Sequence, residues 1–180
     1  MKRLRASSNI KIDDITRQST LFDELDVQHE QVFNVYHAGS SAFQGWNESK
    51  IRDLGLHCSY DKPRLGRSYV AEIQIRRNAK LATVKDANNW TTGDGFCSIL
   101  NDLGSRLDKH EQMDMYRNIR GYLPSQGPEI SKVIRDYLIK QFQIQGLRYR
   151  DIEDGYEDDC ICIIDPSIIV SFENMKRQVQ

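Results

Sequence analysis

The clearest strand signal in the chain lies in residues 69–76, which read Tyr69-Val70-Ala71-Glu72-Ile73-Gln74-Ile75-Arg76. Ile73 and Ile75 alternate with polar residues there, and a period of two residues is typical of a strand with one buried face. We interpret residues 33–37 and residues 54–59 as two further short strands, each followed by turn-forming residues. This part of the chain therefore predicts a sheet.

The middle of the chain repeats with a helical period instead. Apolar residues from Phe96 to Leu107 recur at helical spacing, and Gly93-Asp94-Gly95 provides a boundary before them. A second amphipathic helix is predicted to begin near Pro128, which suits a first helical turn, and to end by Gly146, which suits a C-terminal cap.

The last part of the chain returns to strands. Residues 153–159 hold five carboxylates, and we expect them to form a solvated loop because these charges repel one another. An apolar strand at residues 160–164 and a short strand at residues 168–172 follow. The order of strands, helices and strands predicts an α+β protein with a mainly antiparallel sheet. The length of 180 residues predicts one domain at residues 31–175 with an N-terminal arm at residues 1–30.

Composition and charge argue against several classes of protein. The chain has 25 Lys and Arg residues against 26 Asp and Glu residues, a net charge of −1. Domains that wrap nucleic acid carry a basic excess, so nucleic acid is not expected as a direct ligand. No apolar run approaches the ~18–20 residues that span a bilayer, and no apolar segment follows the basic N-terminus as in a secretory signal. We therefore expect no membrane partner and a cytoplasmic location.

The cysteines also favour a reducing compartment. Four cysteines in 180 residues are too sparse for a disulfide scaffold, and none forms a C-x-x-C pair. Cys160 and Cys162 alternate along one expected strand, so we expect their side chains to point the same way as small buried apolar groups.

Two strand ends carry candidate binding chemistry. The first reads Tyr36-His37-Ala38-Gly39-Ser40-Ser41, where a histidine is followed by small residues that let the backbone approach a planar ligand closely. The second reads Gly55-Leu56-His57-Cys58-Ser59, with Tyr60 and Tyr69 after it as a possible wall for a ring-bearing ligand. The alternatives are a surface histidine before a turn, and a core strand with a satisfied histidine.

The acidic segment at residues 153–159 is the third candidate. A solvated loop is the ordinary interpretation, and its spacing does not match the Ca²⁺ loop of an EF-hand. One of its carboxylates at the mouth of a cleft would stabilise a developing cation, which glycosyl transfer requires because its transition state resembles an oxocarbenium ion. Glycine-rich phosphate loops, nucleophile elbows and zinc-binding helix motifs are absent, and the four histidines lack metal-ligand spacing, so no metal is expected.

Together, the three features resemble the ADP-ribosyltransferase superfamily, in its histidine-bearing branch that includes diphtheria toxin and the poly(ADP-ribose) polymerases. The residues that carry the likeness are Tyr36-His37-Ala38-Gly39-Ser40, Gly55-Leu56-His57-Cys58-Ser59, and Gly146-Leu147-Arg148-Tyr149 followed by the acidic segment and residues 160–166. Their order and spacing match over about residues 33–170. Within this branch the chain looks most like small phage-borne members, including an anti-CRISPR ADP-ribosyltransferase.

The resemblance implies a split antiparallel sheet with flanking helices, and NAD as a co-substrate that is consumed. His37 would bond to the adenosine ribose, and the backbone at Ala38 or Gly39 would hold the carboxamide of nicotinamide. Ser59 and Tyr69 are candidates for ribose contact and ring stacking, with Tyr60 as the alternative stacking residue. The implied cofactor-binding set is completed by Ser40, Gly55 and His57.

An acidic residue would steady the oxocarbenium ion as nicotinamide leaves. Counting forward from Gly146 favours Asp154 as this catalytic residue, whereas the Glu-x-Glu pattern of the family favours Glu157, and both stay candidates.

The activity that the resemblance implies is mono-ADP-ribosyl transfer from NAD to a protein acceptor, which is a glycosyltransferase reaction. The expected setting is a phage or toxin effector that inactivates a host defence component such as a CRISPR complex. NAD hydrolysis, transfer to nucleic acid, and a catalytically inactive module that blocks a partner are the alternatives.

Overall fold

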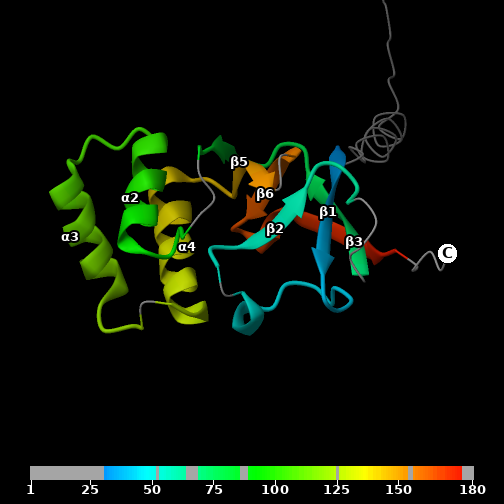
Figure 1. Ribbon diagram of the computed structural model, residues 1–180, viewed down its shortest axis with the longest axis horizontal. Coiled ribbons are helices and arrows are strands. Elements are labelled where there is room, and N and C mark those ends of the chain that lie inside the picture. The colour runs from blue at the N-terminus through cyan, green and yellow to red at the C-terminus, as the bar shows by residue number, and fades with distance from the viewer. Residues whose placement is uncertain are drawn as a thin grey trace, which may run out of the picture. The chain divides into compact units, whose positions relative to one another are not determined.

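The computed structural model of the chain describes residues 31–51, 53–63, 69–85, 89–124, 126–153 and 156–175. The arm predicted at residues 1–30 lies outside the described residues. In the described part, one seven-stranded sheet lies beside three α-helices (Figure 1). The predicted α+β class with a mainly antiparallel sheet is confirmed.

Strands from the two ends of the domain interleave in the sheet. In spatial order they are β4 (Leu81–Thr83), β5 (Gly146–Glu153), β6 (Tyr156–Ile163), β2 (Leu56–Ser59), β1 (Val32–Gly39), β3 (Tyr69–Arg76) and β7 (Ile169–Asn174). All neighbours are antiparallel except β4 and β5, which are parallel. The clearest strand in the sequence, residues 69–76, is β3 with the bounds that its alternation predicts.

The joint between β1 and β2 is the weakest pairing in the sheet. β1 pairs with β3 along its whole length, from Val32 to Gly39. Its register with β2 holds one pair, Tyr36 opposite Ser59. Beyond that pair the end of β1 and the start of β2 are not paired with each other, and the pocket lies at this opening.

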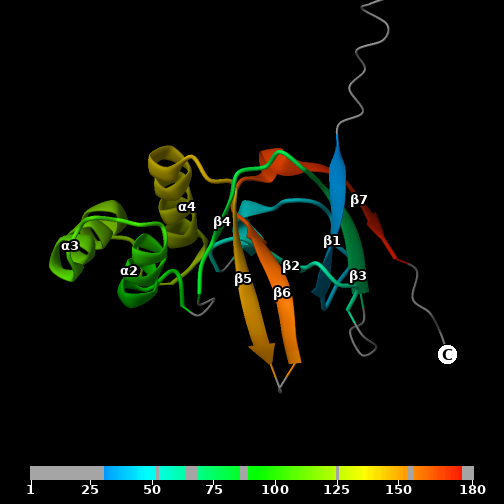
Figure 2. The same cartoon turned by 90° about the horizontal axis from the view of Figure 1, so that it is seen from above.

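The helices pack beside the β4–β5 end of the sheet, as both views show (Figure 2). They are α2 (Gly93–Asp102), α3 (Lys109–Arg120) and α4 (Pro128–Phe142). Their apolar faces bury Phe96, Tyr116 and Ile134 in one hydrophobic core together with Trp90. Two 3-10 helices, η1 (Glu48–Lys50) and η2 (Pro166–Ile168), stand in the connections.

A second core lies on the other face of the sheet, and β6 contributes to both cores. Cys160 and Cys162 belong to the helix-side core, whereas Ile161 and Ile163 belong to the second core. Adjacent residues of a strand point to opposite faces, so β6 alternates between the two cores. The prediction that the two cysteines point the same way as buried apolar groups is confirmed.

The helical repeat expected from Phe96 to Leu107 is shorter in the structure. α2 ends at Asp102, and Gly104 has a φ of +75°, a conformation that L side chains rarely adopt. A separate helix, α3, begins after Asp108 with a capping box, in which Asp108 and Glu111 each bond to the other's backbone N–H. Leu107 therefore lies in the connection and does not extend α2.

The prediction of an acidic loop at residues 153–159 is wrong. Residues 146–153 and 156–163 form the β5–β6 hairpin, so only residues 154 and 155 stand between the strands. Pairing across the hairpin brings Arg150 opposite Asp159, with Nε 3.4 Å from Oδ1, which offsets part of the acidic charge.

Other boundaries also shift by a few residues. α4 begins at Pro128 as predicted but ends at Phe142, where Gln143 takes the left-handed conformation, and Gly146 instead opens β5. The strand expected at residues 54–59 begins at Leu56, and the last strand spans Ile169–Asn174 instead of residues 168–172.

Candidate binding pocket between β1 and β2

A pocket of about 450 Å³ lies where β1 and β2 separate. Its walls come from the end of β1, the start of β2 and the connection between them. The lining residues are His37, residues 39–47, Lys50, Ile51, Asp53 and residues 55–57. The volume falls in the range of small-molecule and cofactor pockets, roughly 300–1,000 Å³.

His37 is fixed in this pocket by a backbone contact. Its Nδ1 lies 2.9 Å from the carbonyl oxygen of His57. A carbonyl can only accept, so Nδ1 carries the proton and donates, and in the neutral ring Nε2 is left with a lone pair. Gly39 leaves room beside this atom, since a Cβ built there would lie 3.4 Å from Nε2. The ring therefore offers a hydrogen-bond acceptor to a hydroxyl donor.

His57 lies on the opposite face of the sheet in a polar chain. Its Nε2 lies 3.0 Å from Oδ2 of Asp53, and its Nδ1 lies 2.7 Å from the hydroxyl oxygen of Tyr149. Its ring stacks on Trp90 with 5.6 Å between centroids. These contacts hold the imidazole from three sides, so the orientation of the Asp53 carboxylate is fixed as well.

The charges of His57 and Asp53 follow from the surroundings of each side chain. Burial disfavours the charged imidazole, but the interactions of the ring with Cys162 and with the Asp53 carboxylate outweigh burial and raise the pKa of His57 to about 10. Burial alone would raise the pKa of Asp53, but its hydrogen bond to His57 and the charge of that imidazole outweigh burial and lower it. At neutral pH the two groups form an ion pair.

Aromatic side chains and one clamp shape the far wall. Phe43 lies with its ring centroid 5.5 Å from that of His37 and 5.0 Å from that of Phe172 on β7. The side chain of Asn174 accepts from the Phe43 backbone N–H at 2.9 Å and donates to its carbonyl at 2.8 Å. The side chain of Asn174 therefore holds the backbone of Phe43 in the pocket wall through two hydrogen bonds, which we call the Asn174 clamp.

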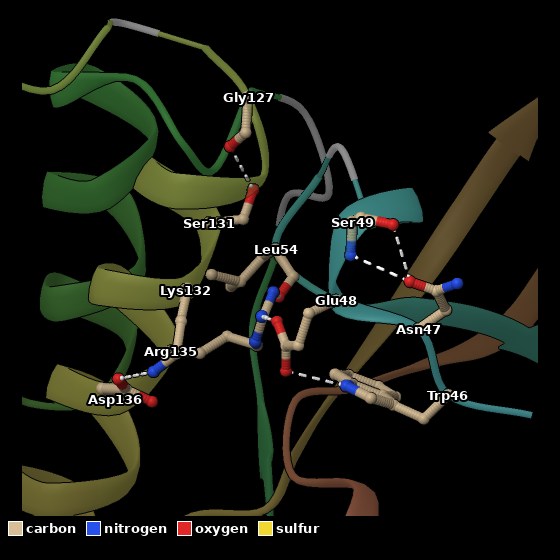
Figure 3. A network of polar contacts seen from close by, with 10 residues as sticks. All are labelled: Trp46, Asn47, Glu48, Ser49, Leu54, Gly127, Ser131, Lys132, Arg135 and Asp136. Carbon is tan, nitrogen blue, oxygen red and sulfur yellow. Dashed lines mark hydrogen bonds and ion pairs between the residues drawn. The ribbon is translucent and has the colours of Figure 1, made fainter.

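A second clamp comes from α4 (Figure 3). Arg135 is 2% exposed, and its guanidinium pairs with Glu48 and donates to the carbonyl of Leu54 at 3.1 Å. The same guanidinium lies 5.3 Å over the Trp46 ring, whose Nε1 donates to Glu48 at 2.8 Å. Trp46 is thus held from two sides in the pocket wall.

The structure brings part of the sequence-derived site together. His37, Gly39, Ser40, Gly55 and His57 all line the pocket. A Cβ on Gly55 would meet the Ile163 carbonyl at 2.1 Å, so glycine is required there by close packing against β6.

Four other candidates stand outside the lining residues. Ala38 lies in β1 opposite Val70, and Tyr69 is 44% exposed. The Ser59 hydroxyl donates to the carbonyl of Asp61. Tyr60 stacks on Phe33 at the second core, with 5.8 Å between ring centroids.

The two acidic candidates belong to the β5–β6 hairpin. Asp154 lies outside the described residues. Glu157 is paired with Ile152 in the hairpin. On β6, Glu157 lies three residues before Cys160, and Cys160 is opposite Ser59, the last residue of β2. The pocket is lined by the other end of β2, so the backbone of Glu157 lies toward the far end of the strand pair. The side chain of Glu157 is outside the described part of the structure.

Comparison with models of known families, with curated proteins and with solved structures finds no match. The resemblance to ADP-ribosyltransferases therefore stands on the sequence motifs. Among the described residues, no group of three or more His, Cys, Asp or Glu side chains could hold a metal ion. None of the described helices is long and apolar enough to cross a membrane.

Sequence reasoning missed the connection between β1 and β2. Phe43, Trp46, Lys50 and Asp53 all line the pocket and come from residues without a repeating pattern. Two aromatic residues three apart, with Gly45 between them, are the available signal, but such a spacing does not by itself distinguish a ligand wall from packing.

Proposed function

We propose that the pocket between β1 and β2 binds NAD and that the chain is an NAD-dependent mono-ADP-ribosyltransferase acting on a protein. The observation that carries this proposal is the fixed ring of His37 at the opening of the sheet, with Nε2 left to accept from a ligand hydroxyl. The motif at residues 36–40, which resembles the first motif of the family, thus supplies His37 to the pocket. The finer fold assignment, an ADP-ribosyltransferase-like split sheet, is part of the same proposal.

The other pocket groups suit a dinucleotide. Phe43 and Trp46 offer flat apolar surfaces to a base or a nicotinamide ring. Lys50 is the one Lys or Arg among the described lining residues, and its ammonium would pair with the pyrophosphate. NAD combines these features: two rings, two riboses with hydroxyl groups, and a central pair of phosphates.

Calorimetric titration of the full chain with NAD tests binding. We expect saturable binding that is weakened by His37→Ala and unchanged by His110→Ala, because His110 is an exposed histidine of α3 with no place in the pocket. Folded protein that takes up no NAD at millimolar concentration would overturn the proposal.

Turnover separates the activities. Release of nicotinamide together with a mass gain of one ADP-ribosyl group on a protein would establish transfer. Release of nicotinamide with free ADP-ribose as the sole other product would establish NAD hydrolysis instead. Binding without either product would identify a binding module. The host-defence setting is tested by searching for the modified protein in infected bacterial cells.

A further inference from the structure

A second cavity, of about 420 Å³, meets the first at one side chain. Its lining residues are Asp53, Asn89, Thr91, Gln126, Gly127 and Pro128. Asp53 lines both cavities, and the polar chain through His57 starts from it. The two spaces are therefore separated by a carboxylate whose position is fixed.

Asp53 is the one acidic residue among the described lining residues of either cavity. Its side chain is 42% exposed, so part of the carboxylate faces open space while Oδ2 lies 3.0 Å from His57 Nε2. An ionised carboxylate with this partial exposure can approach a ligand and stabilise positive charge that develops on it.

The second cavity is polar, and apart from Asp53 its described lining carries no charged side chain. Its lining residues include two with carboxamide side chains, Asn89 and Gln126, and one with a hydroxyl, Thr91. The backbone here is anchored, because the Thr91 carbonyl accepts from the Tyr116 hydroxyl at 2.9 Å and the Asn89 carbonyl accepts from the Thr92 N–H at 2.9 Å. Such a surface suits an uncharged group that both donates and accepts hydrogen bonds.

We propose that Asp53 is the catalytic carboxylate of a two-sided site, with NAD in the first cavity and an uncharged polar acceptor side chain, a hydroxyl or a carboxamide, in the second. This inference rests on the proposed function. The proposal places the catalytic carboxylate in the connection before β2. The resemblance to the family implies a carboxylate in the β5–β6 hairpin instead.

The chemical step balances as follows. The glycosidic bond between C1′ of the ribose and the nicotinamide nitrogen breaks, and its electron pair stays on nicotinamide. Asp53 stabilises the cationic ribose that remains. The acceptor oxygen or nitrogen forms the new bond to C1′ from the second cavity, and its proton passes to the Asp53 carboxylate and then to water.

His57 and Tyr149 are positioning residues in this account. The imidazole donates from Nε2 to Asp53 and from Nδ1 to the Tyr149 hydroxyl oxygen, so the carboxylate keeps one orientation while the other oxygen meets the ligand. Because Asp53 is paired with a cation, it stays ionised at neutral pH.

The first experiment compares carboxylates by single-turnover release of nicotinamide. We expect Asp53→Asn, which retains an oxygen for the bond from His57, to lower the rate about a hundredfold with little change in melting temperature. Asp154→Asn and Glu157→Gln should stay within about threefold of the wild-type rate. Wild-type activity that survives Asp53→Asn but is abolished by a hairpin variant would overturn this inference and leave the proposed function standing. A wild-type protein that neither binds NAD nor releases nicotinamide would overturn both.

The second experiment probes the acceptor cavity and does not depend on Asp53→Asn remaining folded. N-acetylserinamide, N-acetylasparaginamide and N-acetylargininamide serve as acceptors, and the transfer products are quantified by mass spectrometry. We expect the wild-type protein to favour the two uncharged compounds. Asn89→Asp adds a second carboxylate to the cavity and should shift the product ratio at least tenfold toward the arginine compound.

Asn118→Asp is the matched control, since Asn118 is an exposed residue of α3 and its substitution adds the same charge away from both cavities. NAD affinity, measured separately, should be unchanged in Asn89→Asp. Equal product ratios in wild type, Asn89→Asp and Asn118→Asp would contradict the assignment of the second cavity to the acceptor.

Discussion

His37 makes one contact that holds it and leaves one ring atom for a ligand. Replacing it with alanine removes the acceptor at Nε2 but leaves the strand pairing of β1 with β3 intact. We expect His37→Ala to weaken NAD binding by about 1–3 kcal/mol, or roughly five- to 150-fold in Kd, with a small change in melting temperature. Calorimetry and thermal unfolding, with His110→Ala as the control, check this. A large loss of thermal stability without a specific loss of NAD affinity would show that His37 serves the fold.

His57 predicts a pH dependence of stability. The folded-state pKa of His57 is raised to about 10 from an ordinary value of 6.5. Its contribution to the free energy of unfolding is therefore complete below pH 6.5 and is lost as the pH rises toward 10. The pKa of Asp53 is lowered, so its contribution is complete above its ordinary value of 3.8 and is lost as pH falls below it. We expect the free energy of unfolding to decline less between pH 6.5 and 10 in His57→Gln than in wild type. Parallel curves for the two proteins in urea titrations would contradict the raised pKa.

At the scale of single residues, the sequence leads to His37, Gly39 and Gly55 because strand ends and small residues are local signals. Asp53 and Trp46 are not predictable in the same way. Asp53 acquires its neighbour His57 through an irregular connection, and Trp46 is placed by Arg135, which lies 89 residues later. The Trp46–Arg135 contact depends on tertiary packing, which residue patterns within a short window do not encode. The Asp53–His57 contact spans only four residues, but it depends on the path that an irregular connection takes.

Helix α4 acts on the pocket through Arg135. Replacing Arg135 with methionine keeps much of the side-chain volume but removes the donor to Leu54 and the partner of Glu48. We expect Arg135→Met to lower the free energy of unfolding by about 2 kcal/mol, since a buried carbonyl loses its donor, and to weaken NAD binding because Trp46 is released. Urea denaturation and NAD titration measure the two effects.

Lys132→Met provides the comparison on the same helix. Lys132 pairs with Asp136 at the surface, where both side chains are more than half exposed. Exposed pairs contribute about 0–1 kcal/mol, so this variant should resemble wild type in both assays. Equal losses in Arg135→Met and Lys132→Met would mean that α4 is merely sensitive to lost charge.

Elements differ in how well their sequences predict them. β3 and the start of α4 follow from a clean alternation and from Pro128. The apolar spacing from Phe96 to Leu107 predicts one helix there and none at residues 109–120, although Asp108 and Glu111 have the spacing of the capping box that opens α3. The acidic residues of the β5–β6 hairpin favour a loop in the sequence because their charges repel one another. In the structure, strand pairing and the Arg150–Asp159 contact outweigh this repulsion.

The whole molecule contains two tryptophans, and each reports on a different core. Trp90 is buried in the helix-side core, whereas Trp46 packs against the second core. Because β6 supplies residues to both cores, we expect them to unfold together. Fluorescence of Trp46→Phe and Trp90→Phe in urea should give the same midpoint once each curve is corrected for its variant's stability by circular dichroism. Separate midpoints for the two probes would show that the cores unfold independently.

The clamp from Asn174 to Phe43 sets the time at which the pocket is assembled. The two residues are 131 positions apart, and contacts across such long stretches of chain form late because the entropy of closing the loop opposes them. During synthesis β1 and β2 leave the ribosome well before β7. A nascent chain therefore gains a fixed pocket wall only after residue 174 has emerged, so ligand cannot guide the earlier steps of folding.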